Sequence, residues 1–163
     1  CYHILKECYH YTMTKKDFLF LQLSSLPYFR AFLRAIESSY YQDLPMPSPI
    51  YDVGCGDGHF ASLTFDSKLD VGLDPWRFSM REAKKYNAYK SLVEADGARS
   101  PFPSNYFESG LSNSVLEHIP HIDAVLADTA RVLKPGAPFY FCAALQLVSL
   151  GLAVAYFRKH HTA

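Results

Sequence analysis

From residue 50 onward, short apolar runs alternate with amphipathic runs, and this alternation constrains the fold more than any other feature of the sequence. The pattern is typical of a parallel β-sheet whose strands are joined by crossover helices. The apolar runs predict five strands, at residues 50–53, 69–73, 92–95, 108–113 and 138–143. The amphipathic runs predict four helices, at residues 58–65, 78–86, 121–133 and 145–159. We therefore expect an open, mostly parallel α/β sheet with helices on both faces.

A proline cluster at residues 44–49 precedes the first predicted strand, and its rings prevent a helix from continuing through it. The cluster predicts a stiff linker that separates a helical extension, residues 1–47, from a sheet domain, residues 48–163. Within the extension, Ser24, Ser25 and Pro27 form a typical helix opening. The apolar residues that follow at helical spacing predict the buried face of this helix: Phe29, Phe32, Leu33, Ile36 and Tyr40.

Composition excludes several classes of function. With 16 basic and 16 acidic side chains and no basic run, the chain has no patch expected to bind nucleic acid, so a small-molecule ligand is the better expectation. The four cysteines are scattered without a redox or zinc spacing, which favours the cytoplasm and predicts no metal site. Residues 139–157 are apolar enough to suggest a membrane span, but their β-rich start predicts a buried strand that leads into a helix.

Polar or glycine-rich segments follow four of the predicted strands, and in open α/β sheets ligands bind outside these carboxyl ends. Three glycines at alternate positions, Gly54, Gly56 and Gly58, follow the first strand and permit a tight turn close to a ligand. Asp74 follows the second strand, at a place where a carboxylate can accept hydrogen bonds from ribose hydroxyls. Asp96 follows the third strand and Asn113 ends the fourth.

Each of these residues alone has an ordinary structural explanation as a turn or cap residue. Their combination at four strand ends favours a binding site. A nicotinamide dinucleotide site is the obvious alternative, but its G-x-G-x-x-G pattern requires a glycine where this chain has His59.

In these residues the chain resembles the class I S-adenosylmethionine-dependent methyltransferases, in particular the type-11 group, over about residues 48–143. Residues 52–58 resemble the first motif of that family, residues 112–120 its fourth-strand motif, and residues 132–136 the turn before its fifth strand. The resemblance implies a Rossmann-like fold and S-adenosylmethionine as cofactor. It also implies a set of cofactor-binding residues: Asp52, Gly54, Cys55, Gly56, Gly58, Asp74, Pro75, Asp96, Gly97, Ala98 and Asn113.

The chain departs from the family pattern at two places. Ala137 stands where the family usually has a second glycine, and only four residues follow Lys159, where the family sheet ordinarily continues with an antiparallel hairpin. We therefore expect a sheet that lacks this hairpin and a chain that is incomplete at its C-terminus.

Methyl transfer depends mainly on alignment of the acceptor with the methyl carbon, and a general base is needed only when the accepting atom carries a proton. His118 is the candidate base by residue type, although a capping or packing role is the alternative. We therefore expect methyl transfer to a small-molecule acceptor, without nucleic acid or membrane as partner. The alternative function is a non-catalytic binding module with the same fold. The sequence does not predict the oligomeric state.

Overall fold

The computed structural model describes residues 16–142, so the predicted helix at residues 145–159 and the first two cysteines, Cys1 and Cys8, lie outside the described residues. The chain divides into two compact units between Asp43 and Leu44. The described part of the first unit contains two helices, and the second unit contains the predicted sheet. Among the described residues, no helix has both the length and the apolar character needed to cross a bilayer.

Five parallel strands form the sheet of the second unit, in the order β3-β2-β1-β4-β5. Their bounds are β1 Ile50–Val53, β2 Leu69–Asp74, β3 Tyr89–Glu94, β4 Ser109–Asn113 and β5 Phe139–Cys142. The chain builds the sheet outward from β1 to β3 and then returns to place β4 on the other side of β1. The strand order therefore reverses between β1 and β4, which is where open parallel sheets bind ligands.

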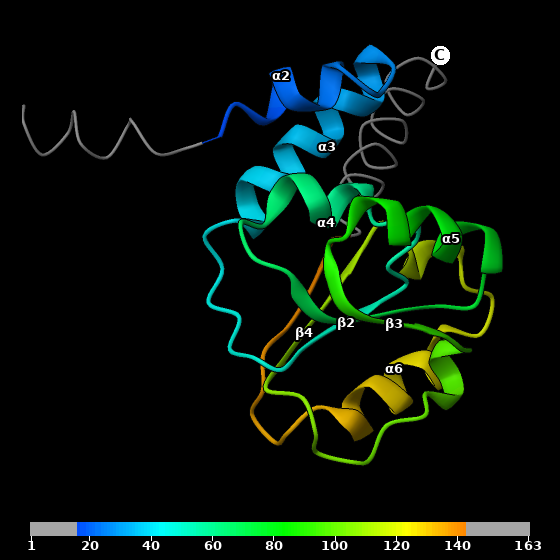
Figure 1. Ribbon diagram of the computed structural model, residues 1–163. Helices are drawn as coiled ribbons and strands as arrows, with labels where there is room; N and C mark the ends of the chain where they lie inside the picture. Colours follow the sequence, from blue (N-terminus) through cyan, green and yellow to red (C-terminus); the bar gives the residue numbers. More distant parts are fainter. Residues whose placement is uncertain (1–15, 143–163) are drawn as a thin grey trace, which may run out of the picture. The chain divides into compact units, whose positions relative to one another are not determined.

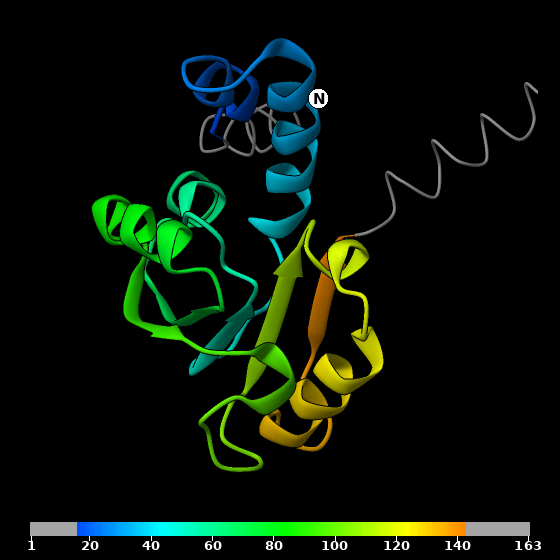
Figure 2. The ribbon, with the colours of Figure 1, turned by 90° about the vertical axis from the view of Figure 1, so that its right-hand side faces the viewer.

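Helices cover both faces of the sheet (Figures 1 and 2). The helices α4, His59–Thr64, and α5, Arg77–Tyr86, lie on one face, and α6, Ile122–Val132, lies on the other. Two short 3-10 helices, η1 Gly97–Arg99 and η2 Leu116–His118, follow β3 and β4. The predicted open parallel α/β fold is confirmed, and within residues 16–142 the sheet contains no antiparallel strand.

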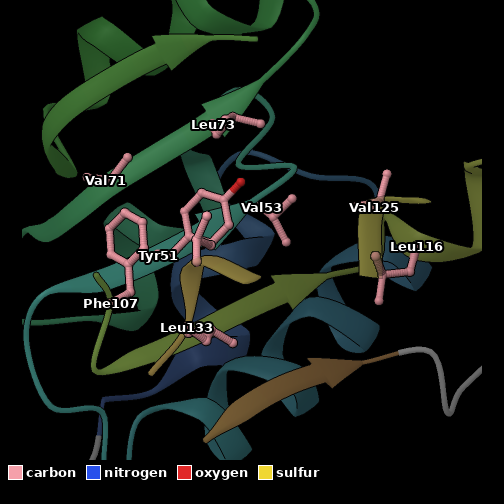
Figure 3. Packing of buried hydrophobic residues seen from close by; sticks show 9 residues of the cluster. Tyr51, Val53, Val71, Leu73, Phe107, Leu116, Val125 and Leu133 are labelled. Atoms are coloured by element: carbon pink, nitrogen blue, oxygen red, sulfur yellow. The ribbon is translucent and has the colours of Figure 1, made fainter. Parts of the chain in front are cut away.

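The hydrophobic core lies between the sheet and α6 (Figure 3). Tyr51 on β1 stacks on Phe107 with a centroid distance of 4.8 Å, and both side chains are fully buried. Val125 and Val132 reach the same cluster from α6. Each such side chain stabilises the fold by roughly 1.5–3 kcal/mol when it is removed from water, so this cluster fixes α6 against β1 and β2.

The β3 strand corrects one expectation. It begins at Tyr89, whereas the sequence predicted a start at Leu92. Lys90 and Ser91 are exposed because β3 is an edge strand, so the first half of the strand lacks the apolar run that identifies a buried strand. Each of the other four strands, as far as the structure describes it, begins and ends within one residue of its predicted bounds.

In the described part of the first unit, α2, Phe18–Leu23, and α3, Tyr28–Tyr41, pack against each other. The helix prediction for α3 is confirmed, but its predicted buried face is wrong. Phe29 is 75% exposed and Tyr40 is 73% exposed, whereas Ala31 and Ala35 are buried. Small side chains allow a neighbouring helix to approach closely, and a pattern of large apolar residues does not reveal such a face.

Candidate functional site

A cavity of about 390 Å³ lies at the carboxyl end of the sheet, where the strand order reverses. Its volume falls within the range of roughly 300–1,000 Å³ that is usual for small-molecule sites. Four segments far apart in the sequence contribute to its wall: Val53, Gly54, Leu73, Asp74, Pro75, Trp76, Asp96, Gly97, Val115, His118, Ile119, Pro120 and Val125. Five of the predicted cofactor-binding residues, together with His118, therefore surround one cavity.

The glycine loop after β1 folds back onto the end of β2. The backbone N–H groups of Gly54 and Cys55 both donate to the carbonyl oxygen of Leu73, at 2.7 and 3.0 Å. Gly54 has φ +79°, and a Cβ placed there would lie 2.4 Å from Cγ1 of Val115. Only glycine fits this position, because any side chain meets both a strained backbone and the opposite wall of the cavity. Gly58, with φ +75°, precedes the first turn of α4.

Asp74 ends β2 and holds two loops at the cavity. Its Oδ2 accepts a hydrogen bond from the N–H of Gly56 at 3.0 Å, and its Oδ1 accepts one from the N–H of Trp76 at 2.8 Å. Each oxygen of an ionised carboxylate can accept two hydrogen bonds, so both oxygens retain capacity for a ligand. The side chain lines the cavity and is 9% exposed, which places a fixed acceptor at the wall.

The loop after β3 forms the next part of the wall. Asp96 is the N-cap of η1, and its Oδ1 accepts a hydrogen bond from the N–H of Ala98 at 2.9 Å. Asp96 and Gly97 line the cavity, whereas Ala98 is not part of the wall. A Cβ at Gly97 would lie 3.2 Å from side-chain atoms of Val53 and Val125, so glycine allows this loop to lie close to β1 and α6.

Asp52 is turned away from the cavity. It is 4% exposed, and its Oδ2 accepts a hydrogen bond from the hydroxyl of Tyr89 at 2.6 Å. Burial, with a smaller contribution from the charge of Asp74, raises the pKa of Asp52 to about 7, although the Tyr89 hydrogen bond opposes this shift. Burial also raises the pKa of the Cys55 thiol, which is therefore protonated and unreactive. Cys55 does not line the cavity.

His118, at the end of η2, is exposed and forms part of the cavity wall. Its neighbour Glu117 has one carboxylate oxygen, Oε2, that is buried without a hydrogen-bond partner in the described part of the chain. Asn113 ends β4, where it is buried and pairs in register with Cys142, and it does not line the cavity. His118 is therefore the polar side chain of η2 that lines the cavity, where it is placed for proton transfer or for orientation of a ligand.

Sequence reasoning missed the apolar part of the wall. Trp76 is 68% exposed although it lines the cavity, and Val115, Ile119 and Pro120 close the opposite side. The position of Trp76, two residues after Asp74, was the available signal. The resulting cavity combines a largely apolar interior with carboxylates at Asp74 and Asp96. This combination suits a flat aromatic ligand that carries hydroxyl and amino groups.

A second cavity, of about 350 Å³, lies beside the C-terminal half of α6 and the start of β5. Asn105, Thr129, Lys134 and Phe139 belong to its wall, and none of the predicted site residues does. Within residues 16–142, His, Cys, Asp and Glu side chains do not gather into a group that could hold a metal ion. The first cavity is therefore the candidate functional site.

Comparison with known proteins gives three results. Residues 51–141, more than half of the chain, match the family model described as "Methyltransferase domain". The chain is 34% identical over 95 residues to a sterol 24-C-methyltransferase of Pneumocystis carinii, which covers 53% of this chain and 25% of that enzyme. It is 27% identical over 115 residues to a tRNA (carboxymethyluridine(34)-5-O)-methyltransferase of Schizosaccharomyces pombe, which covers 68% of this chain and 49% of that enzyme.

Among solved structures, a SAM-dependent methyltransferase of Thermotoga maritima, titled a possible histamine N-methyltransferase, superposes with a TM-score of 0.55 at 20% identity. The superposition covers 66% of this chain and 52% of that chain. At this identity the similarity shows that the fold is shared. The chain also spans no more than about half the length of the two curated relatives.

Proposed function

The chain belongs to the methyltransferase domain family, and from this membership we propose that it transfers a methyl group from S-adenosylmethionine to a small-molecule acceptor. The observation that carries the proposal is the shared wall of one cavity. Gly54, Asp74, Asp96 and His118 come from four strand ends and meet around about 390 Å³ of largely apolar space. The alternative is a binding module with this fold and no catalytic activity.

The cavity residues fit the three parts of the cofactor. The free acceptor capacity of Asp74 suits the two ribose hydroxyls, which are both hydrogen-bond donors. The exposed indole ring of Trp76 can cover a flat base, and Asp96 lies on the same side of the site as an acceptor for an amino group. The bare backbone at Gly54 leaves room for the methionine part.

The bound cofactor supplies an electrophilic methyl group on a sulfonium, with a neutral thioether as leaving group. The protein then has to align the acceptor and, if the accepting atom carries a proton, to take that proton. His118 is exposed at the cavity wall and is the proposed base. Glu117, whose Oε2 is buried without a hydrogen-bond partner among the described residues, lies next to it on the same short helix but does not line the cavity.

A small molecule is the proposed acceptor class because the chain is neutral overall and the cavity walls are mostly apolar. The named relatives methylate a sterol and a tRNA, so the family alone does not select an acceptor. We also propose a cytoplasmic location. Its support is that the four cysteines are scattered through the sequence without the close spacing of a thiol redox motif, as expected in a reducing compartment.

Binding of S-adenosylhomocysteine tests the proposal directly. We expect micromolar affinity by calorimetry, no measurable binding of NAD, and loss of binding in Asp74→Ala. A ligand at 100 times its dissociation constant stabilises the folded state by about 2.7 kcal/mol, so thermal unfolding provides a second readout. Binding of NAD without binding of S-adenosylhomocysteine would end the proposal. Binding without turnover of any acceptor would favour the non-catalytic module.

The role of His118 requires a separate comparison. If it is the base, His118→Gln lowers kcat by about 100-fold or more while the dissociation constant of S-adenosylhomocysteine stays unchanged. The matched variant Glu117→Gln, one residue away on η2, distinguishes a specific effect from a general disturbance of this helix. Unchanged turnover in His118→Gln, or loss of turnover only in Glu117→Gln, would remove His118 from the mechanism.

A further inference from the structure

Two charged side chains on α6 hold the loop that follows η1. Oδ2 of Asp128 accepts hydrogen bonds from the backbone N–H of Ser100, at 3.0 Å, and from the Ser100 hydroxyl. Oδ1 of Asp128 accepts a hydrogen bond from Nε of Arg131 at 2.9 Å. Arg131 then donates to the carbonyl oxygen of Phe102 at 2.7 Å and to that of Ser100 at 3.1 Å. We call these two side chains, Asp128 and Arg131, the α6 clamp.

Both side chains of the α6 clamp are hydrogen-bonded, and Asp128 is the more buried of the two. The Asp128 side chain is 10% exposed and that of Arg131 is 37% exposed. Burial tends to raise the pKa of Asp128, but the hydrogen bonds from Ser100 and Arg131 outweigh it and the net shift is downward. Asp128 is therefore ionised at neutral pH, and its bonds are charge-assisted and stronger than neutral ones.

The clamped loop is continuous with the cavity wall. Ser100 directly follows η1, whose N-cap is Asp96, and Asp96 and Gly97 both line the cavity. Val125, one turn before Asp128 on α6, packs against Gly97 and also lines the cavity. One face of α6 therefore fixes this loop at two points, by an apolar contact at Gly97 and by the α6 clamp at Ser100.

We propose that Asp128 and Arg131 are positioning residues that set the specificity of the site for its base, by holding Asp96 in place to accept a hydrogen bond from the amino group of adenine. This inference rests on the proposed function. Neither clamp residue lines the cavity, so both act through the loop. A hydrogen bond contributes to specificity only when its acceptor is held in a fixed place, and a loop bound only through Gly97 would let the Asp96 carboxylate move.

The geometry explains why the clamp uses arginine. Three nitrogens of one planar guanidinium contact Asp128, Phe102 and Ser100, so the group holds the loop on both sides of Pro101. Lysine carries a single ammonium group and cannot span these acceptors. Arg131→Lys therefore keeps the charge and removes the planar arrangement, whereas Asp128→Asn keeps the shape and removes the charge.

The test compares two ligands. S-adenosylhomocysteine carries the amino group that Asp96 would accept, and S-inosylhomocysteine carries a carbonyl oxygen in its place. We expect the wild-type protein to bind S-adenosylhomocysteine more tightly than S-inosylhomocysteine. Asp128→Asn and Arg131→Lys should each reduce the ratio of the two affinities about tenfold, which corresponds to a loss of about 1.4 kcal/mol in binding free energy. Glu82→Gln is the matched control, because Glu82 forms an i,i+3 pair with Lys85 on α5 and neither residue lines the cavity.

The ratio of the two affinities separates positioning from simple destabilisation. A clamp that only stabilises the fold would weaken both ligands equally, and an unchanged ratio in both folded variants would overturn the inference. Circular dichroism and thermal unfolding show whether each variant folds. If one variant does not fold, the affinity ratio of the other variant tests the inference. If the wild-type protein binds neither ligand, the proposed function fails together with the inference. If only the inference about the α6 clamp fails, the wild-type protein still binds S-adenosylhomocysteine and still prefers it to S-inosylhomocysteine.

Discussion

Gly54 is the residue at which a single methyl group should have the largest effect on the site. In Gly54→Ala, the added Cβ meets Val115 at 2.4 Å while the backbone keeps φ +79°. A left-handed conformation costs an L-residue about 1–2 kcal/mol, and overpacking adds about 1–3 kcal/mol. We expect a loss of about 2–5 kcal/mol in the free energy of unfolding, measured by denaturant titration, and loss of ligand binding.

Gly136→Ala isolates the backbone part of this effect. Gly136 has φ +81°, and no atom lies within 4 Å of an added Cβ. This variant should lose only about 1–2 kcal/mol and should bind S-adenosylhomocysteine normally. Equal losses in the two variants would show that the contact with Val115 relaxes without cost and that Gly54 is not needed for space in the cavity.

Asp52 predicts a pH dependence of stability. Its pKa is about 7 in the folded protein and 3.8 as an ordinary value, so between these pH values the folded state binds a proton that the unfolded state has released. The stabilisation is complete below pH 3.8 and is lost as the pH rises through 7. At 1.36 kcal/mol per pKa unit, the total change is on the order of 4 kcal/mol.

Asp52→Asn should remove this slope, because an amide does not titrate and can still pair with the Tyr89 hydroxyl. The measurement is the difference between wild-type and variant free energies of unfolding from pH 4 to 8. Asp70 and Asp128 do not interfere, because their pKa values are lowered and their contributions change at more acid pH. Parallel curves for the two proteins would contradict a raised pKa at Asp52.

The polar residues of the site were predictable because strand ends identify them. Asp74 and Asp96 each follow a predicted strand, and the fold then brings them to one cavity. Val115 was not predictable, because an apolar residue near a strand end looks the same whether it enters the core or lines a cavity. For Trp76 the only signal was its position two residues after Asp74. The inward turn of Asp52 depends on Tyr89, 37 residues away, and no local pattern carries that contact.

Among the elements, the central strands β1 and β2 matched their predicted positions within one residue, whereas the β3 edge strand differed most from its prediction. β1 and β2 are almost entirely buried because helices cover both of their faces, and most of their side chains are apolar. β3 has one open edge and carries Lys90 and Ser91, so its first half resembles a loop in the sequence. The hydrophobic pattern therefore predicted the start of the edge strand β5, which opens with Phe139, within one residue, but it missed the start of β3, where exposed polar residues occur early in the strand.

The corrected face of α3 gives a prediction at the scale of one helix. Ala31 is fully buried, so Ala31→Leu should overpack the helix contact and cost about 1–3 kcal/mol. Phe29 is 75% exposed, and Phe29→Gln should change stability by no more than about 0.5 kcal/mol. Thermal unfolding of both variants measures the difference. A larger loss in Phe29→Gln than in Ala31→Leu would restore the aromatic face as the buried one.

For the whole molecule, strand order is what turns separate loops into one site. β1 lies in the centre of the sheet with β2 on one side and β4 on the other, so the loops after β1, β2 and β4 open at the same edge. Residues between Gly54 and His118 thereby meet around one cavity although 64 positions separate them in the sequence. The sequence predicts this convergence only because parallel strands place all their carboxyl ends together.

Hydrogen exchange can test this convergence across the molecule. Addition of S-adenosylhomocysteine should slow exchange at the four segments that contribute to the cavity wall, 53–54, 73–76, 96–97 and 115–120, because ligand binding suppresses local opening of the loops. The segment 134–137 lies at the second cavity and serves as the internal control, with no expected change. Protection confined to one of the four segments would contradict a shared site. Protection centred on 134–137 would instead move the ligand to the second cavity.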